Sequence, residues 1–130
     1  MTPDALRCFF EDWLDASNRH DLAAMRELLA PEVRRAGAPA GADAWLADVA
    51  ELLAAFPDYR WKRIQLVVEE DRVAAHLRTR GTHRGVYRGI RPTGRHVGVA
   101  AFGFYRVRNG RIVEYAGSDD EVALTAQLTG

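Results

Sequence analysis

Residues 95–116 read RHVGVAAFGFYRVRNGRIVEYA, and this stretch decides the fold. Asn109-Gly110 is the strongest short signal for a two-residue β-hairpin, because both residues accept the positive φ that a type I′ turn requires. The turn predicts a long strand over residues 95–107 followed by a second strand over residues 111–116. The C-terminal half of the chain is therefore expected to form an antiparallel sheet.

The same strand-like pattern continues upstream of this hairpin. Residues 59–69 and 72–82 alternate between apolar and polar side chains and are separated by a turn at residues 70–71. Residues 85–89 allow one more short piece before a turn at residues 92–94, which read Pro-Thr-Gly. The sheet is thus expected to be a meander of neighbouring strands.

The N-terminal half has helical spacing instead. An aromatic stripe follows Thr2-Pro3 and predicts a first helix over residues 3–17. Asp21 is expected to cap a second helix, which carries Leu28 and Leu29 on its apolar face and ends at Pro31.

A loop and two more helices complete the pattern. Residues 34–42 are rich in Arg, Gly, Ala and Pro and predict a loop or a poor strand. Asp43 is expected to cap a third helix that Pro57 ends, and residues 121–128 predict a short final helix.

Helices first and strands after them predict a single α+β domain over residues 1–130. A long, twisted antiparallel sheet with helices on one side curves around them into a cone-shaped α+β barrel, whose mouth can hold a small ligand. We expect the inner strand face and the aromatic first helix to line this pocket.

The 18 basic and 18 acidic side chains cancel to a net charge of zero, so neither a nucleic acid nor an anionic membrane is expected as a partner. Residues 1–58 hold 5 Arg and 11 acidic residues, whereas residues 59–130 hold 13 basic and 7 acidic ones. Residues 72–113 contain no carboxylate. The single cysteine excludes an internal disulfide, and no apolar stretch is long enough to cross a bilayer. We expect a cytoplasmic protein.

Several kinds of site lack support in the sequence. There is no glycine-rich phosphate loop, and the four histidines never occur at the short spacings typical of metal ligands. We therefore expect neither a cofactor nor a metal, and any chemistry must come from polar groups in the apolar pocket.

One histidine and three carboxylates are the candidate acid–base groups. Alternation from Val73 onward places His83 on the apolar face of its strand, although a loop position just past the strand end is the alternative. Asp119 and Asp120 precede the final helix and could simply cap it. At the rim of an apolar cavity, however, such a carboxylate would have a raised pKa and could act as base and then acid. Glu114 competes for this role, because alternation does not decide which face of its strand is inside.

The order of motifs from Phe56 onward resembles the SnoaL-like polyketide cyclases. The motifs are FPD (56–58), EEDRVA (69–74), RTRGTHRG (78–85), Gly89, PTG (92–94), YRVRNGRIVE (105–114), Asp120 and QL (127–128). The corner NRHDL (18–22) is also similar to the wider superfamily.

This resemblance implies the cone-shaped α+β barrel shared with ketosteroid isomerase and nuclear transport factor two, and a homodimer packed through the sheet. It also implies that no metal or cofactor takes part. In cyclases of this kind a carboxylate near the end of the last strand acts as acid and base in an intramolecular aldol closure. That position matches Asp120, and the Gly-Thr-His histidine of the family matches His83.

The leading hypothesis is a cyclase for a small hydrophobic polyketide-type metabolite, as found in antibiotic and other secondary metabolism. Two alternatives are an epoxide hydrolase or epoxide-opening cyclase that uses the same Asp and His, and a non-catalytic ligand-binding domain. The basic sheet half would lower the pKa of the carboxylates that follow it and so oppose the effect of burial. The residues expected to contact the substrate are Trp13, Trp45, Phe56, Arg78, Phe102, Tyr105 and Glu114.

Overall fold

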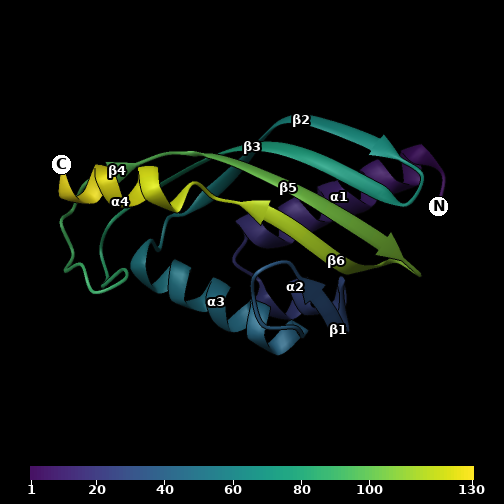
Figure 1. The fold of residues 1–130 in the computed structure, drawn as a ribbon, viewed down its shortest axis with the longest axis horizontal. Coiled ribbons are helices and arrows are strands. Elements are labelled where there is room, and N and C mark those ends of the chain that lie inside the picture. The colour runs from purple at the N-terminus through teal and green to yellow at the C-terminus, as the bar shows by residue number, and fades with distance from the viewer.

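Four helices and six strands form the protein, described from a computed structural model that covers residues 1–130 (Figure 1). In chain order they are α1 (Pro3–Asn18), α2 (Leu22–Glu27), β1 (Leu29–Arg35), α3 (Ala42–Ala55), β2 (Arg60–Glu69), β3 (Arg72–Thr82), β4 (His96–Val97), β5 (Ala100–Arg108), β6 (Arg111–Ser118) and α4 (Glu121–Thr129). No helix is both long and apolar enough to span a membrane.

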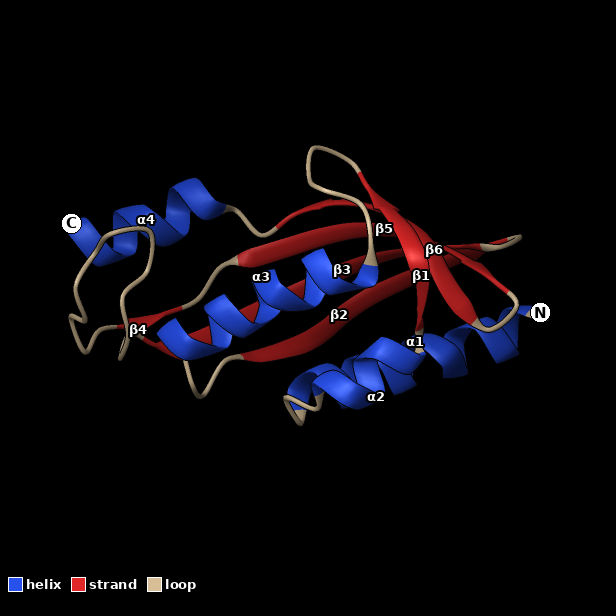
Figure 2. Cartoon of the chain, turned by 90° about the horizontal axis from the view of Figure 1, so that it is seen from below, coloured by secondary structure: helices blue, strands red, loops and turns tan.

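The strands form one curved, unclosed sheet in the order β1-β6-β5-β3-β2, and the short β4 pairs with the end of β3. Neighbouring strands are antiparallel except for β1, which runs parallel to β6. Helices α1, α2 and α3 lie on one side of the sheet, and α4 lies at its far end beside β4 (Figure 2). The expected α+β architecture of a curved sheet with N-terminal helices is confirmed.

Local signals in the sequence account for most element boundaries. Thr2 caps α1 by accepting a hydrogen bond from the Ala5 amide, and Asp21 caps α2 in the same way. Strand β3 covers the expected residues 72–82. Asn109 and Gly110 have φ values of 52° and 71°, as the type I′ hairpin requires.

Three expectations about the elements were wrong. The second helix stops at Glu27, and the residues up to Arg35 form β1 because Leu29 pairs with Ile112 of β6 and is buried there. Gly41, not Asp43, caps α3.

The third correction concerns the long strand over residues 95–107, which is broken into β4 and β5. The break falls where Gly98 passes close to β3, since a Cβ at Gly98 would lie 2.9 Å from the Thr79 carbonyl oxygen.

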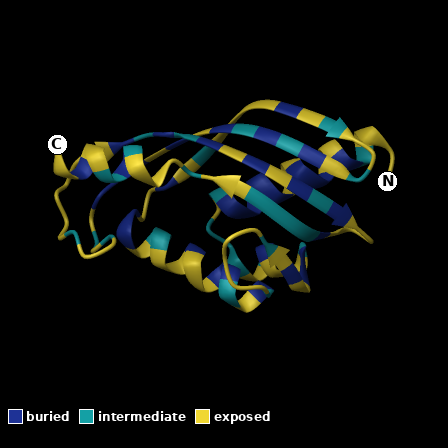
Figure 3. Cartoon of the chain, viewed as in Figure 1, coloured by how far each residue is buried: buried dark blue, intermediate teal, exposed yellow.

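The core has two parts, and buried and exposed residues alternate along the strands (Figure 3). The larger part fills the space between α1, α3 and the inner face of the sheet. The smaller part lies near α4 and contains Phe56, Tyr59, Leu124 and Leu128. These two clusters, together with the sheet between them, form the walls of the site described next.

Candidate functional site

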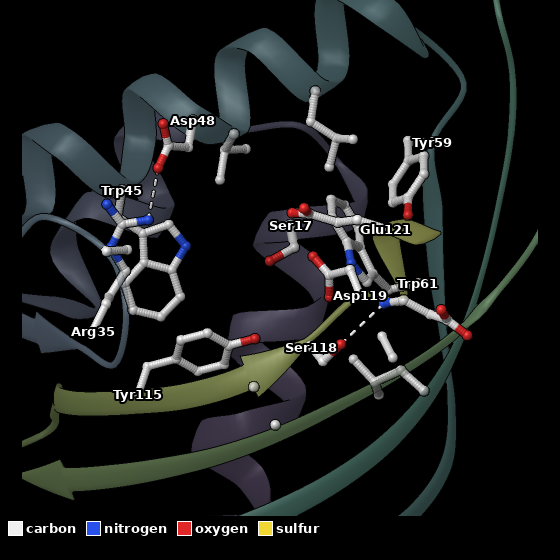
Figure 4. Close-up of a pocket in the computed structure, with 18 of the residues that line it drawn as sticks. Ser17, Arg35, Trp45, Asp48, Tyr59, Trp61, Tyr115, Ser118, Asp119 and Glu121 are labelled. Atoms are coloured by element: carbon white, nitrogen blue, oxygen red, sulfur yellow. Dashed lines mark hydrogen bonds and ion pairs between the residues drawn. The ribbon is translucent and has the colours of Figure 1, made fainter. Parts of the chain in front are cut away.

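A cavity of about 1110 Å³ opens between α3, the inner face of the sheet and the start of α4 (Figure 4). Every layer of the fold contributes an aromatic ring to its wall. These residues are Trp13 from α1, Trp45 from α3, Tyr59 and Trp61 from the start of β2, Tyr105 from β5 and Tyr115 from β6. The wall is therefore mainly hydrophobic and rich in aromatic rings, as suits a flat organic ligand.

Two glycines open the floor of this cavity. Gly103 and Gly117 pair across β5 and β6. A Cβ at Gly103 would lie 2.8 Å from a ring carbon of Tyr105, and a Cβ at Gly117 would overlap the Tyr115 hydroxyl. The two phenol rings lean over this gap with their centroids 4.9 Å apart. The absence of side chains at Gly103 and Gly117 thus leaves room for the phenol groups of Tyr105 and Tyr115 at the floor of the cavity.

Asp119 lies in the short segment between β6 and α4 and projects into the cavity near Ser17 and Trp61 (Figure 4). Burial raises the pKa of Asp119, and the nearby negative charge of Glu121 raises it further. Neither a hydrogen bond nor an ion pair to this carboxylate opposes that rise. The side chain is therefore a half-buried carboxylate that borders the cavity and that no hydrogen bond or ion pair of the protein engages.

Three tyrosines face this carboxylate. Burial is the main reason why the pKa values of Tyr59, Tyr105 and Tyr115 are raised, and the negative charge of Asp119 contributes at all three. Each phenol is therefore held in its protonated, hydrogen-bond-donating form. The cavity combines one basic group with several neutral donors.

The basic run of residues 72–113 does not lower the pKa of Asp119. Alternation along β3 turns Arg78 and Arg80 to the outer face, where both are exposed, whereas Leu77 and Thr79 point inward. No cation is among the groups that shift the pKa of Asp119. At this carboxylate, burial prevails.

Asp120 lies beside Asp119 but turns the other way. Its backbone is left-handed, with φ at 46°, and its Oδ1 accepts a hydrogen bond of 3.2 Å from the Ala123 amide. Asp120 is thus the N-cap of α4, and its side chain is exposed at the border of the cavity. Because of this positive φ, the adjacent side chains diverge: Asp119 enters the cavity, whereas Asp120 caps α4.

Glu114 lies outside the cavity. It pairs with Arg106 across β5 and β6 on the outer face of the sheet, and its carboxylate forms ion pairs with Arg34 and, at 3.5 Å, with Arg106. A shallow groove contains all three residues. Its charge is therefore already balanced by arginines.

His83 lies just past the end of β3, as the alternative had it, yet its side chain is completely buried, as the alternation predicts. It is not among the residues that line the cavity, however, and its ring packs against Phe56 at 5.4 Å between centroids. Its Nδ1 accepts a hydrogen bond of 3.1 Å from the Thr93 amide, and its Nε2 has no partner. The structure therefore does not bring His83 and Asp120 together in one site.

Of the residues expected to contact the substrate, Trp13, Trp45 and Tyr105 line the cavity with their side chains buried. Phe102 borders it, but the ring is 53% exposed and stacks on His76 at 4.5 Å. The other three, Phe56, Arg78 and Glu114, do not line it.

Sequence reasoning missed several residues of the wall. Tyr59 directly precedes β2 and Trp61 is the second residue of that strand, so the period of a strand could have placed both on the inner face. Arg35 had no such signal. Its guanidinium is nearly buried, donates to Asp48 at 2.8 Å and to the Pro39 carbonyl, and lies 5.8 Å from the Trp45 ring centre.

No group of three or more His, Cys, Asp or Glu side chains lies close enough together to hold a metal ion. The charged residues of the wall are largely engaged elsewhere: Arg35 pairs with Asp48, Arg88 pairs with Glu121, Asp120 caps α4 and Glu51 is exposed. The polar groups that remain are the Asp119 carboxylate, the tyrosine hydroxyls, Ser17 and Ser118. This set can accept and donate protons to a bound organic molecule.

Comparisons with known proteins agree with this geometry. The family model for the SnoaL-like polyketide cyclase matches residues 6–128. IdmH from Streptomyces antibioticus, described as a candidate polyketide cyclase, is 33% identical, with 96% of this chain and 99% of that chain covered and a TM-score of 0.83.

Two further solved structures share the fold at lower identity. AclR from Streptomyces galilaeus, described as a candidate hydroxylase, has a TM-score of 0.90 at 24% identity, covering 98% of this chain and 83% of its own. TsrD from Streptomyces laurentii has a TM-score of 0.88 at 23% identity, covering 98% and 97%. A search of curated protein sequences found no significant match.

Proposed function

The chain belongs to the SnoaL-like polyketide cyclase family, and from this premise we propose that it closes a ring in a polyketide-type metabolite by intramolecular aldol chemistry. Asp119 is the acid–base group, and the aromatic cavity folds the substrate. IdmH, which shares a third of its residues with this chain, supports a polyketide as the substrate class.

The observation that carries this proposal is the state of the Asp119 carboxylate. It projects into the cavity, burial raises its pKa, and no protein donor engages it. A carboxylate without hydrogen bonds in an apolar site is a stronger base than one in water. It can take a proton from carbon and return it as a carboxylic acid.

The reaction is an isomerisation that needs no other reactant. Asp119 removes a proton from a carbon flanked by carbonyl groups, and the electron pair of that C–H bond moves into an enolate. The enolate carbon attacks a second carbonyl carbon of the same molecule, which forms the new C–C bond and leaves an alkoxide. The alkoxide takes the proton back from Asp119. Holding both ends of one molecule in a reactive pose supplies several kcal/mol of the barrier.

The pairing of Asp120 with His83 as acid and base stays a prediction that competes with Asp119. Asp120 is exposed and caps α4, whereas His83 is buried against Phe56 and does not line the cavity, which argues against the two side chains acting on one substrate. We therefore prefer Asp119, and substitution at each position decides between the two assignments.

The volume and the aromatic walls of the cavity favour a substrate with several rings. About 1110 Å³ is slightly above the roughly 300–1,000 Å³ typical of small-molecule sites. Trp13 and Trp45 pack edge to face at 5.5 Å and form one wall, and Tyr115 lies 4.9 Å from Trp45 and continues it. Such rigid aromatic surfaces stack on flat ring systems.

A second copy of this chain is the proposed partner at the outer face of the sheet. Val67, Ala74 and Phe104 lie in one row across β2, β3 and β5, and Phe104 is 64% exposed. Phe102 lies beside this row and is also exposed. Arg106 and Glu114 flank this apolar patch. Two-fold symmetry would bring the patches of two copies together and could place each charge near the opposite charge of the other copy.

The proposal is tested with aromatic β-keto esters that carry a pendant ketone, in a series of increasing ring number. Ring closure appears in liquid chromatography and mass spectrometry as a product of unchanged mass or as its dehydrated form. We expect turnover by the natural chain and a loss of about 100-fold or more in kcat for Asp119→Asn.

Asp120→Asn is the matched control, because Asn is as good an N-cap as Asp and also tolerates a left-handed backbone. It is expected to keep most of the rate. If Asp120→Asn or His83→Ala abolishes turnover while Asp119→Asn retains it, the Asp120/His83 assignment is right. Binding of the esters without any turnover would instead indicate a ligand-binding domain.

A further inference from the structure

Only two buried side-chain polar atoms of this protein lack a hydrogen-bond partner, namely Tyr59 Oη and His83 Nε2. Unpaired buried polar atoms are rare in folded proteins, and each calls for a physical explanation. His83 does not line the cavity, whereas Tyr59 does. Of the two, only the Tyr59 phenol therefore borders the cavity, with its oxygen covered by neighbouring atoms.

The ring of Tyr59 has little freedom to move. Trp61 packs on it edge to face at 4.9 Å, and Phe56 lies 5.7 Å away. On the β3 side, a Cβ at Gly81 would be 3.0 Å from a Tyr59 ring carbon, so only glycine leaves room for the ring. Tyr59 is 1% exposed. Its position is thus fixed by packing, with the hydroxyl as the one unpaired group.

The backbone around Tyr59 is also held, by the polar corner between α1 and α2. The His20 ring donates a hydrogen bond of 2.7 Å to the Tyr59 carbonyl oxygen. The Asn18 amide group donates to the Trp61 carbonyl at 2.9 Å and accepts from the Trp61 amide at 2.8 Å. This corner matched the wider superfamily in sequence, and its structural role is to fix the strand that carries Tyr59.

The hydroxyl points into the same space as Asp119 (Figure 4). The two groups make no hydrogen bond with each other, although the charge of Asp119 acts on Tyr59. A molecule bound between them would have the base on one side and a hydrogen-bond donor on the other. Burial raises the pKa of the Tyr59 phenol more than the nearby Thr79 side chain lowers it, so the hydroxyl keeps its proton; Thr79 makes no hydrogen bond of good geometry with it.

We infer that Tyr59 is a second catalytic residue, whose hydroxyl donates a hydrogen bond to the oxygen on which the enolate charge develops. This inference rests on the proposed function, in which Asp119 generates that enolate. A preorganised donor in a water-poor site stabilises developing charge far better than water does. No proton is transferred from Tyr59, so the atom balance of the aldol step is unchanged.

The inference also restricts the ligand. A productive substrate presents a carbonyl oxygen to Tyr59 while its acidic carbon faces Asp119. A planar oxyanion with delocalised charge, such as a phenolate, has the shape and charge of that enolate and serves as a probe. Binding of such a probe needs no turnover and is therefore independent of the ring-closure assay.

The test uses 4-nitrophenolate in mildly alkaline buffer, with nitrobenzene as the uncharged control ligand. Asp119→Asn removes the repelling charge and stands in for the protonated carboxyl group that exists once the enolate has formed. We expect Asp119→Asn to bind 4-nitrophenolate, and the double variant Asp119→Asn with Tyr59→Phe to bind it about tenfold or more weakly. Nitrobenzene should bind both proteins equally.

In the cyclisation assay, Tyr59→Phe alone should lower kcat by about 100-fold with little change in KM. Equal phenolate binding by the two proteins, or phenolate binding no tighter than that of nitrobenzene, overturns the role of Tyr59. If no ester cyclises but phenolate binding depends on Tyr59, the proposed function fails and the oxyanion site stands. If Asp119 proves essential for turnover and Tyr59→Phe has full activity, the proposed function stands and this inference fails.

Discussion

Replacing Asn18 with Ala should destabilise the fold by more than its position at a helix end would indicate. The Asn18 side chain satisfies both backbone polar groups of Trp61 on the edge strand β2, at 2.8 and 2.9 Å. Each lost bond costs about 1 kcal/mol, and a backbone group left unpaired in a buried place costs about 1–3 kcal/mol. Because water reaches part of this site, we expect a total loss of about 2–4 kcal/mol.

That loss is a large share of the about 5–15 kcal/mol that stabilises a typical domain. For a chain of this length each kcal/mol lowers Tm by about 4 °C, so Tm should fall by about 8–16 °C. Urea unfolding followed by far-ultraviolet circular dichroism gives the free energy and, from the slope, a check that the transition stays two-state.

Arg19→Ala is the matched control. Arg19 is the next residue and forms ion pairs with Asp15 and Asp21, but its side chain is 55% exposed. Surface pairs of this kind contribute about 0–1 kcal/mol. If Asn18→Ala costs no more than Arg19→Ala, the corner does not hold β2 and the account of how Tyr59 is fixed is refuted.

Four further outcomes follow from the geometry. The pKa of Asp119 is raised in the folded protein, so its contribution to stability is present in full below its ordinary pKa of 3.8 and is lost as pH rises through the folded pKa. Asp119→Asn should therefore raise the free energy of unfolding near neutral pH and give no gain below pH 3.8. A gain of equal size at both pH values would contradict the burial of the charge. Tyr59→Phe removes an unpaired buried hydroxyl and should leave stability unchanged or raise it by about 1 kcal/mol in urea unfolding; a clear loss would indicate that the hydroxyl has a structural partner. Gly117→Ala should cost about 1–3 kcal/mol and weaken ligand binding, because the new methyl overlaps the Tyr115 hydroxyl; wild-type Tm and affinity would show that the floor is not tight. Phe104→Asp should convert a dimer to a monomer in analytical ultracentrifugation, and an unchanged sedimentation coefficient argues against the outer face as the interface.

The elements that local chemistry specifies could be predicted from the sequence. The Thr2 and Asp21 caps, the alternation along β3 and the Asn109-Gly110 turn each depend on residues that are near one another in the chain. Strand β1 could not be predicted, because it forms only by pairing with the parallel strand β6. The paired residues Arg34 and Glu114, for example, are 80 positions apart in the sequence. Its sequence alone has no strand period.

The site was harder to predict for a similar reason. Periodicity could place His83 inside the protein. It could not decide whether the side chain lines the cavity or packs against the neighbouring apolar cluster that contains Phe56. It also could not separate Asp119 from Asp120, because the chain leaves β6 at Ser118 and then turns through a left-handed residue. The net charge of the sheet half was misleading as well, since Arg78 and Arg80 of β3 alternate onto the outer face and no cation shifts the pKa of Asp119.

The most direct test of the central claim is the titration of the Asp119 carboxyl group by ¹³C NMR, assigned by comparison with Asp119→Asn. We expect a midpoint above 3.8, because the carboxylate is partly buried in a tyrosine-lined cavity and has no hydrogen-bond donor. A midpoint at or below 3.8 would show that the carboxylate is solvated or paired, and Asp119 could not then be the base that this account requires.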